Sequence, residues 1–284
     1  MSPAPALPPV IDVERFRTLR AQPGVRVAEV RWALDGSKDR STFLAGHVPG
    51  SVYIDLGTAL AAPARPEAGR HPLPDPADFA AALGAAGIGD GDTVLALDDT
   101  DGSQASRLVW MLRALGVEAA LLDGGLAAWT ADGGELSTDA LAPGPAAFTP
   151  RPWGSDVTAS ADEVEAVAGR PGSVVIDARA PERFRGDTEP IDPRAGHVPG
   201  AINVPFAGNV GADGRFLDPQ ALRERFAAAG VGETDEIIVY CGSGVTATHD
   251  LLALERAGFT GARLFPGSWS QWSADARREV ATGE

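Results

Sequence analysis

"DEIIVYCGSGVTATHDLLALERAGF", residues 235–259, contains the parts of one folding unit in consecutive order. The apolar run before Cys241 predicts a buried strand, and the spacing of apolar residues after the loop predicts a helix that Gly258 is placed to end. Between them stands the glycine-rich loop CGSGVT, which begins at the only cysteine of the chain. A short apolar strand followed directly by a helix is typical of an α/β domain, in which helices cover both faces of a parallel sheet.

The same pattern occurs earlier in the chain. The run DTVLALD ends at Asp98 and precedes the predicted helix SRLVWMLRALG, and GHVPG occurs at residues 46–50 and again at 196–200. The blocks ending at Asp98 and Cys241, and those ending at Trp129 and Trp272, keep the same separation. Self-similarity in register indicates a duplicated domain. We therefore predict an α/β fold with two similar domains, each a parallel sheet flanked by helices.

The domain limits follow from a change in composition. Residues 137–156, "STDALAPGPAAFTPRPWGSD", are rich in Pro, Gly and Ala and show no apolar periodicity, which predicts a linker. The first domain then covers residues 1–136 and the second covers residues 157–284.

Composition excludes several classes of protein. A net charge of −15 repels phosphate backbones, so nucleic acid is not expected as a partner. No apolar stretch approaches the roughly 20 residues that a membrane helix needs. One cysteine and four histidines without metal-ligand spacing predict neither a disulfide nor a metal site. The N-terminal residues lack the features of a secretory or mitochondrial signal, so we expect a cytoplasmic protein.

The cysteine loop has the composition of an anion-binding site. Cys241 stands at the carboxyl end of a parallel strand, where open α/β sheets place their ligands. Glycines allow the backbone N–H groups of the loop, at Gly242, Gly244, Val245 and Thr246, to turn toward the sulfur. Because a thiol is reactive as the thiolate, such donors predict an activated nucleophile. The alternative is a buried cysteine that acts as a small apolar residue.

A cysteine in a strand–loop–helix is also found in tyrosine phosphatases, whose chemistry needs an arginine six residues after the cysteine to hold phosphate. That position is Ala247 in this chain. A phosphatase site is therefore not expected.

Several motifs together resemble the two-domain rhodanese family of sulfurtransferases. They are the two GHVPG segments, VVIDARAPERFRG, the single cysteine in the second copy, and PGSWSQW at residues 266–272. The resemblance implies two rhodanese-like domains, of which the first, with Asp98 in the cysteine position, is inactive. It also implies a small-molecule sulfur donor, an acceptor such as cyanide, a thiol or thioredoxin, and no organic or metal cofactor.

The resemblance assigns roles to individual residues. The uncharged loop CGSGVT is similar to that of 3-mercaptopyruvate sulfurtransferases, and Arg183 matches the position that binds the substrate carboxylate. Arg194 is a candidate for a second carboxylate ligand. Ser243 and His71, in GRHPLP, match a proton relay. Its usual aspartate is replaced by Gly57, which leaves Asp55 or a water as possible substitutes.

Three interpretations remain open at this point. The first is transfer of sulfur from 3-mercaptopyruvate, with release of pyruvate, through a persulfide on Cys241. The second is a thiosulfate sulfurtransferase on the same scaffold. The third is a non-catalytic sulfur carrier or interaction protein in which Cys241 senses oxidants. His47 and His197, in the two GHVPG segments, are expected to hydrogen-bond backbone groups and fix their loops.

Overall fold

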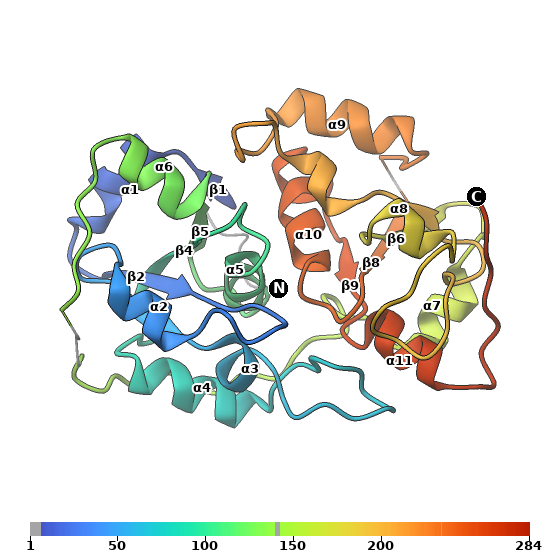
Figure 1. Cartoon of the computed structure of the whole chain (residues 1–284), viewed down its shortest axis with the longest axis horizontal. Helices are drawn as coiled ribbons and strands as arrows, with labels where there is room; N and C mark the ends of the chain where they lie inside the picture. Colours follow the sequence, from blue (N-terminus) through green and yellow to red (C-terminus); the bar gives the residue numbers. More distant parts are fainter. Residues whose placement is uncertain (1–6, 140–142, 234) are drawn as a thin grey trace. The chain divides into compact units, whose positions relative to one another are not determined.

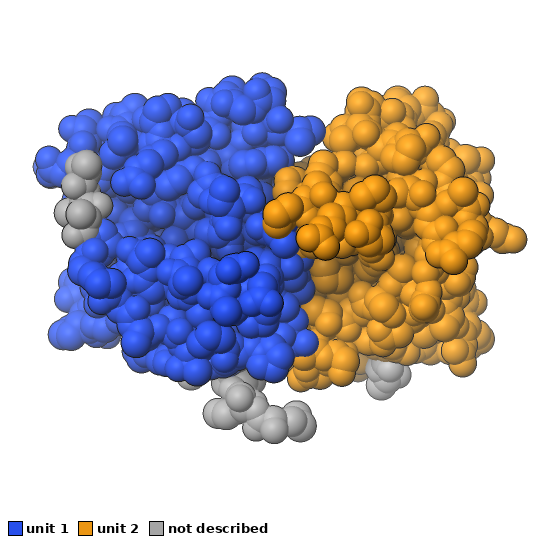
Figure 2. Space-filling view, turned by 90° about the horizontal axis from the view of Figure 1, so that it is seen from below, with its two compact units in different colours: residues 1–62, 73–153, 212–215 blue, residues 63–72, 154–211, 216–284 orange. Residues whose placement is uncertain are grey.

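The structure, a computed structural model, describes residues 7–139, 143–233 and 235–284 (Figure 1). Contacts divide the chain into two compact units, coloured separately in Figure 2. Unit 1 comprises Met1–Ala62, Leu73–Trp153 and Ala212–Arg215; unit 2 comprises Pro63–Pro72, Gly154–Gly211 and Phe216–Glu284. The division at Trp153 falls inside the predicted linker, whose residues 143–153 contain neither helix nor strand. Pro63–Pro72 belongs to unit 2 although it lies within the first sequence copy.

Unit 1 contains a five-stranded parallel sheet with the strand order β1-β5-β4-β2-β3. Its strands are β1 (Val10–Ile11), β2 (Val25–Val30), β3 (Val52–Ile54), β4 (Thr93–Asp98) and β5 (Ala119–Leu122). Its helices are α1 (Val13–Arg20), α2 (Arg40–Ala45), α3 (Leu56–Ala59), α4 (Pro76–Ala85), α5 (Ala105–Ala114) and α6 (Gly125–Ala131).

Unit 2 contains a four-stranded parallel sheet with the strand order β7-β6-β8-β9. Its strands are β6 (Ser173–Asp177), β7 (Ile202–Asn203), β8 (Glu236–Tyr240) and β9 (Arg263–Leu264). Its helices are α7 (Ala161–Val167), α8 (Pro181–Phe184), the 3-10 helix η1 (Phe206–Asn209), α9 (Pro219–Ala228), α10 (Ala247–Arg256) and α11 (Ser268–Ala274).

The two sheets repeat one topology, which confirms the predicted duplication. The order β5-β4-β2-β3 in unit 1 corresponds to β9-β8-β6-β7 in unit 2. Each GHVPG segment also plays the same part in its unit. His47 Nδ1 is hydrogen-bonded to the Phe43 carbonyl at 3.1 Å, and His197 Nδ1 to the Phe184 carbonyl at 2.8 Å. The structural role expected of both histidines is therefore confirmed.

Helices cover both faces of the second sheet (Figure 1). On one face, Ile238 and Tyr240 of β8 pack in a buried cluster with Trp269 and Trp272 of α11 and with residues of α7. Strand residues alternate in direction, so Val239 points to the other face, where α10 contacts β8. Burial on both faces explains the continuous apolar run of β8 and fixes its carboxyl end. Among the described helices, none combines the length and apolar character needed to cross a membrane.

Candidate active site

Cys241 directly follows β8, at the carboxyl end of the second sheet, and its side chain is buried. The backbone N–H of Gly244 donates to Cys241 Sγ at 3.1 Å. The Cys241 backbone is fixed to the start of α11, because its N–H donates to Ser268 Oγ at 3.2 Å and its carbonyl accepts the N–H of Trp269 at 2.9 Å. The sulfur thus faces a directed N–H donor, which stabilises an anionic sulfur.

The loop after the cysteine turns tightly at Gly244. This glycine has a φ of +76°, and a Cβ on it would lie 2.5 Å from the carbonyl oxygen of Pro266. A side chain there would displace the loop. Val245, which follows, is buried, and Thr246 immediately precedes α10. Among the four loop residues predicted to hold an anion, Gly244 is the one whose N–H donates to the cysteine sulfur.

Ser268 supports the cysteine from a strained conformation. Its φ of +53° is the only positive value of a non-glycine residue in the described ranges. Its buried hydroxyl donates to the Phe265 carbonyl at 2.9 Å and accepts the N–H of Cys241. The equivalent residue of unit 1 is Gly125, with a φ of +54°. A serine in place of glycine costs backbone strain and supplies the acceptor that fixes the Cys241 backbone.

The corresponding loop of unit 1 is an anion cradle that holds a carboxylate of the chain itself. Asp98 Oδ1 accepts the backbone N–H groups of Thr100 at 2.9 Å and Gly102 at 3.0 Å. Asp98 Oδ2 accepts those of Gln104 at 2.9 Å and Ala105 at 2.8 Å, at the start of α5. The strand-to-helix loop of this fold can therefore direct four N–H groups at one anion.

The structure brings His71 and Ser243 together, as the sequence predicted. His71 Nδ1 lies 2.8 Å from Ser243 Oγ, and both side chains are buried. The segment Pro63–Pro72, which carries His71, is part of unit 2, and Gln271 of α11 anchors it by donating to the Glu67 carbonyl at 2.7 Å. A hydroxyl and an imidazole in this arrangement can pass a proton.

Asp55, one suggested substitute for the third member of the relay, already has partners in unit 1. Its Oδ1 accepts the backbone N–H of Thr58 at 2.8 Å and the hydroxyl of the same residue at 2.9 Å. Its Oδ2 accepts the Tyr53 hydroxyl at 2.9 Å. Asp55 therefore acts as the N-cap of α3.

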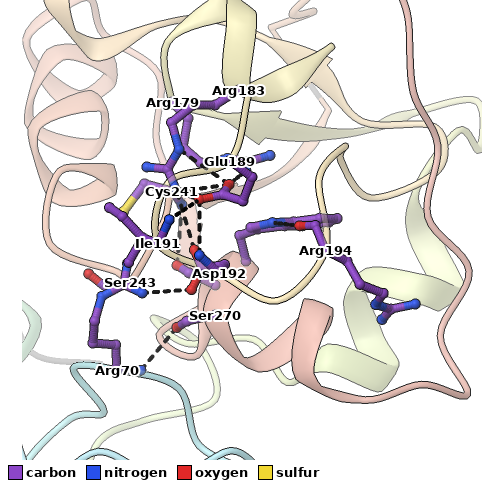
Figure 3. A network of polar contacts seen from close by, with 12 residues as sticks. Arg70, Arg179, Arg183, Glu189, Ile191, Asp192, Arg194, Cys241, Ser243 and Ser270 are labelled. Atoms are coloured by element: carbon purple, nitrogen blue, oxygen red, sulfur yellow. Dashed lines mark hydrogen bonds and ion pairs between the residues drawn. The ribbon is translucent and has the colours of Figure 1, made fainter. Parts of the chain in front are cut away.

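The guanidinium groups of Arg70 and Arg183 lie beside Gly242. Figure 3 shows both arginines together with Glu189 and Asp192, the carboxylates that they contact. A Cβ on Gly242 would lie 3.2 Å from Arg70 Nη2 and 3.3 Å from Arg183 Nη1. Buried carboxylates hold both arginines. Arg70 Nη1 donates to Asp192 Oδ1 at 2.6 Å, while Arg183 Nη2 donates to Glu189 Oε1 at 2.7 Å and to Asp192 Oδ2 at 3.2 Å. Arg183 thus lies next to the cysteine loop, where the sequence placed it.

The two carboxylates differ in their electrostatic balance. Burial acts to raise the pKa of Glu189, but hydrogen bonds from Arg183 and from backbone N–H groups outweigh it, so this pKa lies below its ordinary value. For Asp192, burial raises the pKa, and the charge of Arg70 offsets only part of that effect. Glu189 is therefore a firmly ionised anchor for Arg183.

Arg194 does not contribute to this group. Its Nε donates to the Ser273 carbonyl at 2.7 Å, and its Nη1 donates to the Arg278 carbonyl at 2.8 Å. Its Nη2 donates to the carbonyls of Trp272 at 2.8 Å and Asp275 at 2.7 Å. In Figure 3 the side chain points away from the cysteine. The expectation of a second carboxylate ligand at Arg194 is corrected: this guanidinium donates to carbonyls in the last turn of α11 and in the segment that follows it.

Sequence reasoning did not identify Arg70, Glu189, Asp192 or Ser268. Arg70 directly precedes His71, so the assignment of that histidine could have drawn attention to it. Glu189 and Asp192 stand in TEPIDP, an acidic stretch that by itself reads as a solvated loop. Ser268 carries no local signal, because its role depends on a φ value and on contact with a residue 27 positions away.

Comparison with known proteins finds similarity over nearly the whole chain. Residues 12–132 and 160–275 each match the rhodanese-like domain family. The chain is similar to the "Probable 3-mercaptopyruvate sulfurtransferase" of Pseudomonas aeruginosa, with 46% identity over 97% of this chain and 98% of that protein. It is also similar to the "Putative thiosulfate sulfurtransferase SseB" of Mycobacterium tuberculosis, with 39% identity over 93% of both chains.

A solved structure agrees with these sequence relationships. The crystal structure of the 3-mercaptopyruvate sulfurtransferase SseA from Escherichia coli superimposes with a TM-score of 0.81 and 30% identity, covering 93% of this chain and 99% of that one. The family resemblance stated from the motifs, and the fold it implies, are thereby confirmed.

Proposed function

This chain belongs to the rhodanese family, and from that premise we propose that it is a sulfurtransferase which takes sulfur from 3-mercaptopyruvate through a persulfide on Cys241. One observation carries the proposal. Cys241 is buried, and its sulfur accepts a hydrogen bond from a backbone N–H of its own loop. The Arg183 guanidinium lies beside Gly242 of the same loop. A nucleophile and a guanidinium group beside the same loop fit a small thiol-bearing keto acid.

In the first step, the Cys241 thiolate attacks the sulfur of 3-mercaptopyruvate. A sulfur–sulfur bond forms, the carbon–sulfur bond of the substrate breaks, and its electron pair remains on carbon as the pyruvate enolate. Arg183 holds the carboxylate, so that the substrate sulfur is directed at the cysteine. The Gly244 N–H stabilises charge on Sγ throughout.

The enolate must then receive a proton before pyruvate leaves. Ser243 and His71 supply a route, because the serine hydroxyl is hydrogen-bonded to the imidazole at 2.8 Å. The serine gives its proton to the enolate carbon and recovers one from the histidine. The Ser243–His71 pair therefore favours 3-mercaptopyruvate as the sulfur donor, because its leaving group, the pyruvate enolate, is a strong base that must be protonated.

The loop of unit 1 that is equivalent to the cysteine loop shows how an anionic persulfide can be held. The Asp98 side chain, in the position equivalent to Cys241, extends its two oxygens into four backbone N–H groups. A persulfide lengthens the cysteine side chain by one sulfur, so its outer atom reaches a comparable distance along the loop. The N–H groups near the start of α10 thus stabilise the anionic persulfide.

In the second step, a thiophilic acceptor attacks the outer sulfur and restores the Cys241 thiolate. Cyanide leaves as thiocyanate, and a small thiol or reduced thioredoxin leaves as a persulfide. Because the enzyme alternates between two covalent forms, ping-pong kinetics follow. Acceptor thiols are kept reduced in the cytoplasm, which is the location we propose for this reaction.

A second donor, thiosulfate, is favoured by one specific feature. Arg70 adds a second guanidinium beside Gly242, and cationic groups near the cysteine suit a small dianion. The relative from Mycobacterium tuberculosis carries a thiosulfate name. Both donors form the same persulfide and differ in the group that leaves.

The test is steady-state sulfur transfer to cyanide by the purified protein, with kcat/KM measured for 3-mercaptopyruvate and for thiosulfate. We expect a higher kcat/KM for 3-mercaptopyruvate and a mass increase of one sulfur atom on Cys241 when the acceptor is omitted. Cys241→Ser should abolish both while the protein keeps its thermal midpoint. Turnover that survives in Cys241→Ser would refute the persulfide route, and a wild-type preference for thiosulfate would replace the donor.

A further inference from the structure

Charged side chains of unit 2 form one continuous network of ion pairs, most of which Figure 3 shows. Carboxylates and guanidinium groups alternate in this ion-pair network, in the order Asp177, Arg179, Glu189, Arg183, Asp192 and Arg70. The side chains of the three carboxylates are at most 3% exposed. Because three carboxylates face three guanidinium groups, the network carries no net formal charge.

One end of the ion-pair network lies beside the cysteine loop. Arg70 Nη2 and Arg183 Nη1 are 3.2 and 3.3 Å from the point that a Cβ of Gly242 would occupy. Asp192 accepts from the other terminal nitrogens, Arg70 Nη1 at 2.6 Å and Arg183 Nη2 at 3.2 Å. An anionic donor at the loop therefore meets two guanidinium groups, each of which has its far nitrogen bound to the Asp192 carboxylate.

The charge of Asp192 acts on any anion that binds at this end of the network. Two like charges repel each other, and burial keeps water and salt from screening the repulsion. Because this energy is proportional to the charge of the ligand, it is about twice as large for a dianion as for a monoanion. The network thus offers hydrogen-bond donors to an anion but no excess positive charge to balance a second negative charge.

We infer that Asp192 is a specificity-determining residue, which selects sulfur donors with one negative charge over donors with two. The inference rests on the proposed function, because it concerns the donor that forms the persulfide on Cys241. Arg70 taken alone favours a dianion such as thiosulfate. Asp192 is bound to that same guanidinium and offsets this preference through its charge, from behind the two arginines.

The test compares two donors that share their reacting atoms and differ in charge. Thiosulfate is a dianion, whereas methanethiosulfonate has a methyl group in place of one oxygen and is a monoanion. With either donor, the Cys241 thiolate attacks the outer sulfur, the sulfur–sulfur bond of the donor breaks, and its electron pair leaves on sulfite or methanesulfinate. Neither leaving group needs a proton at carbon, so the Ser243–His71 pair does not influence the comparison. The full-length protein is assayed for kcat/KM with cyanide as acceptor.

Asp192→Asn removes the charge and keeps the size of the side chain, and Asp192→Glu keeps the charge. Asp187→Asn is the matched control, because Asp187 is an aspartate of the same segment whose side chain is 54% exposed and pairs with Arg185. We expect Asp192→Asn to raise the ratio of kcat/KM for thiosulfate to that for methanethiosulfonate by about tenfold, the size of one charge interaction in a partly sheltered site. Any loosening of Arg70 and Arg183 affects both donors and cancels in this ratio. Asp192→Glu and Asp187→Asn should keep the ratio within about twofold of wild type.

An unchanged or lower ratio in Asp192→Asn would overturn the inference, and so would an equal rise in Asp187→Asn. Inhibition of the wild-type protein makes the same comparison without any variant. Methanesulfonate should inhibit sulfur transfer more strongly than sulfate, and stronger inhibition by sulfate would also overturn the inference. Failure of the proposed function is recognised separately, because wild-type protein would then transfer no sulfur from 3-mercaptopyruvate, whatever the ratio for the other two donors.

Discussion

Gly244→Ala tests whether the loop geometry activates the cysteine. The substitution adds one methyl group where φ is +76° and where the Cβ would lie 2.5 Å from the Pro266 carbonyl oxygen. The left-handed conformation costs about 1–2 kcal/mol for a residue with a Cβ. The contact with a backbone oxygen cannot be relieved by a side-chain rotation, so the loop must move and the Gly244 N–H must leave Cys241 Sγ.

The size of the functional effect follows from that hydrogen bond. A bond to a charged group contributes about 1.5–3 kcal/mol, which corresponds to a loss of about 10- to 150-fold in kcat/KM. The assay is sulfur transfer to cyanide together with the rate of Cys241 alkylation by iodoacetamide at fixed pH. Both rates should fall, because the thiolate loses its donor.

Gly261→Ala separates strain from loop displacement. Gly261 has the same φ of +76°, belongs to the same unit, and has nothing within 4 Å of its would-be Cβ. This variant should lower the thermal midpoint by about 2–8 °C and leave both rates unchanged. If Gly244→Ala kept kcat/KM within about twofold of wild type, the argument that this N–H activates the sulfur would be refuted.

Two further predictions concern other parts of unit 2. Ser243→Ala, which breaks the 2.8 Å contact with His71, should reduce kcat with 3-mercaptopyruvate by about 100-fold or more and affect thiosulfate much less, because sulfite leaves without protonation at carbon; equal losses would contradict the relay. Burial raises the pKa of Asp250 to about 8, and the hydrogen bond from Asn209 and the charge of Arg225 offset only part of this effect. The folded state therefore holds a proton that the unfolded state releases near pH 4, so stability should fall as pH rises from about 4 to 8, by up to about 1.4 kcal/mol per pH unit. Asp250→Asn should remove this slope in urea unfolding at pH 5 and pH 8, and an unchanged slope would contradict the assignment.

Local patterns in the sequence were enough to predict the elements around the nucleophile. The run before Cys241 forms β8, as its continuous apolar residues predicted, and the run after the loop forms α10, as the helical spacing of its apolar residues predicted. Both signals depend only on residues that are close together in the sequence. The two GHVPG segments and the equal spacing of Asp98 and Cys241 predicted the duplication, which the matching strand orders confirm. Repetition is visible without any knowledge of contacts.

Arg194 shows where such reasoning fails. An arginine near a substrate-binding motif has the right chemistry for a carboxylate, but its sequence position does not say which acceptors lie nearest to it. Four backbone carbonyls in the last turn of α11 and in the segment after it, 78 to 84 residues away, hold it instead. Arg70, which the sequence analysis did not single out although it directly precedes His71, is held at the cysteine loop by Asp192, 122 residues later.

Local sequence patterns are sufficient to predict two copies of an α/β domain and a single thiol that follows a central strand of the second copy. These features depend on apolar periodicity and on glycine, whose effects are local. Only the folded chain brings distant polar side chains together near the cysteine loop, for example His71 and Ser243, which are 172 positions apart. A buried polar group binds the partner that best satisfies it, and the fold determines which partners are within reach.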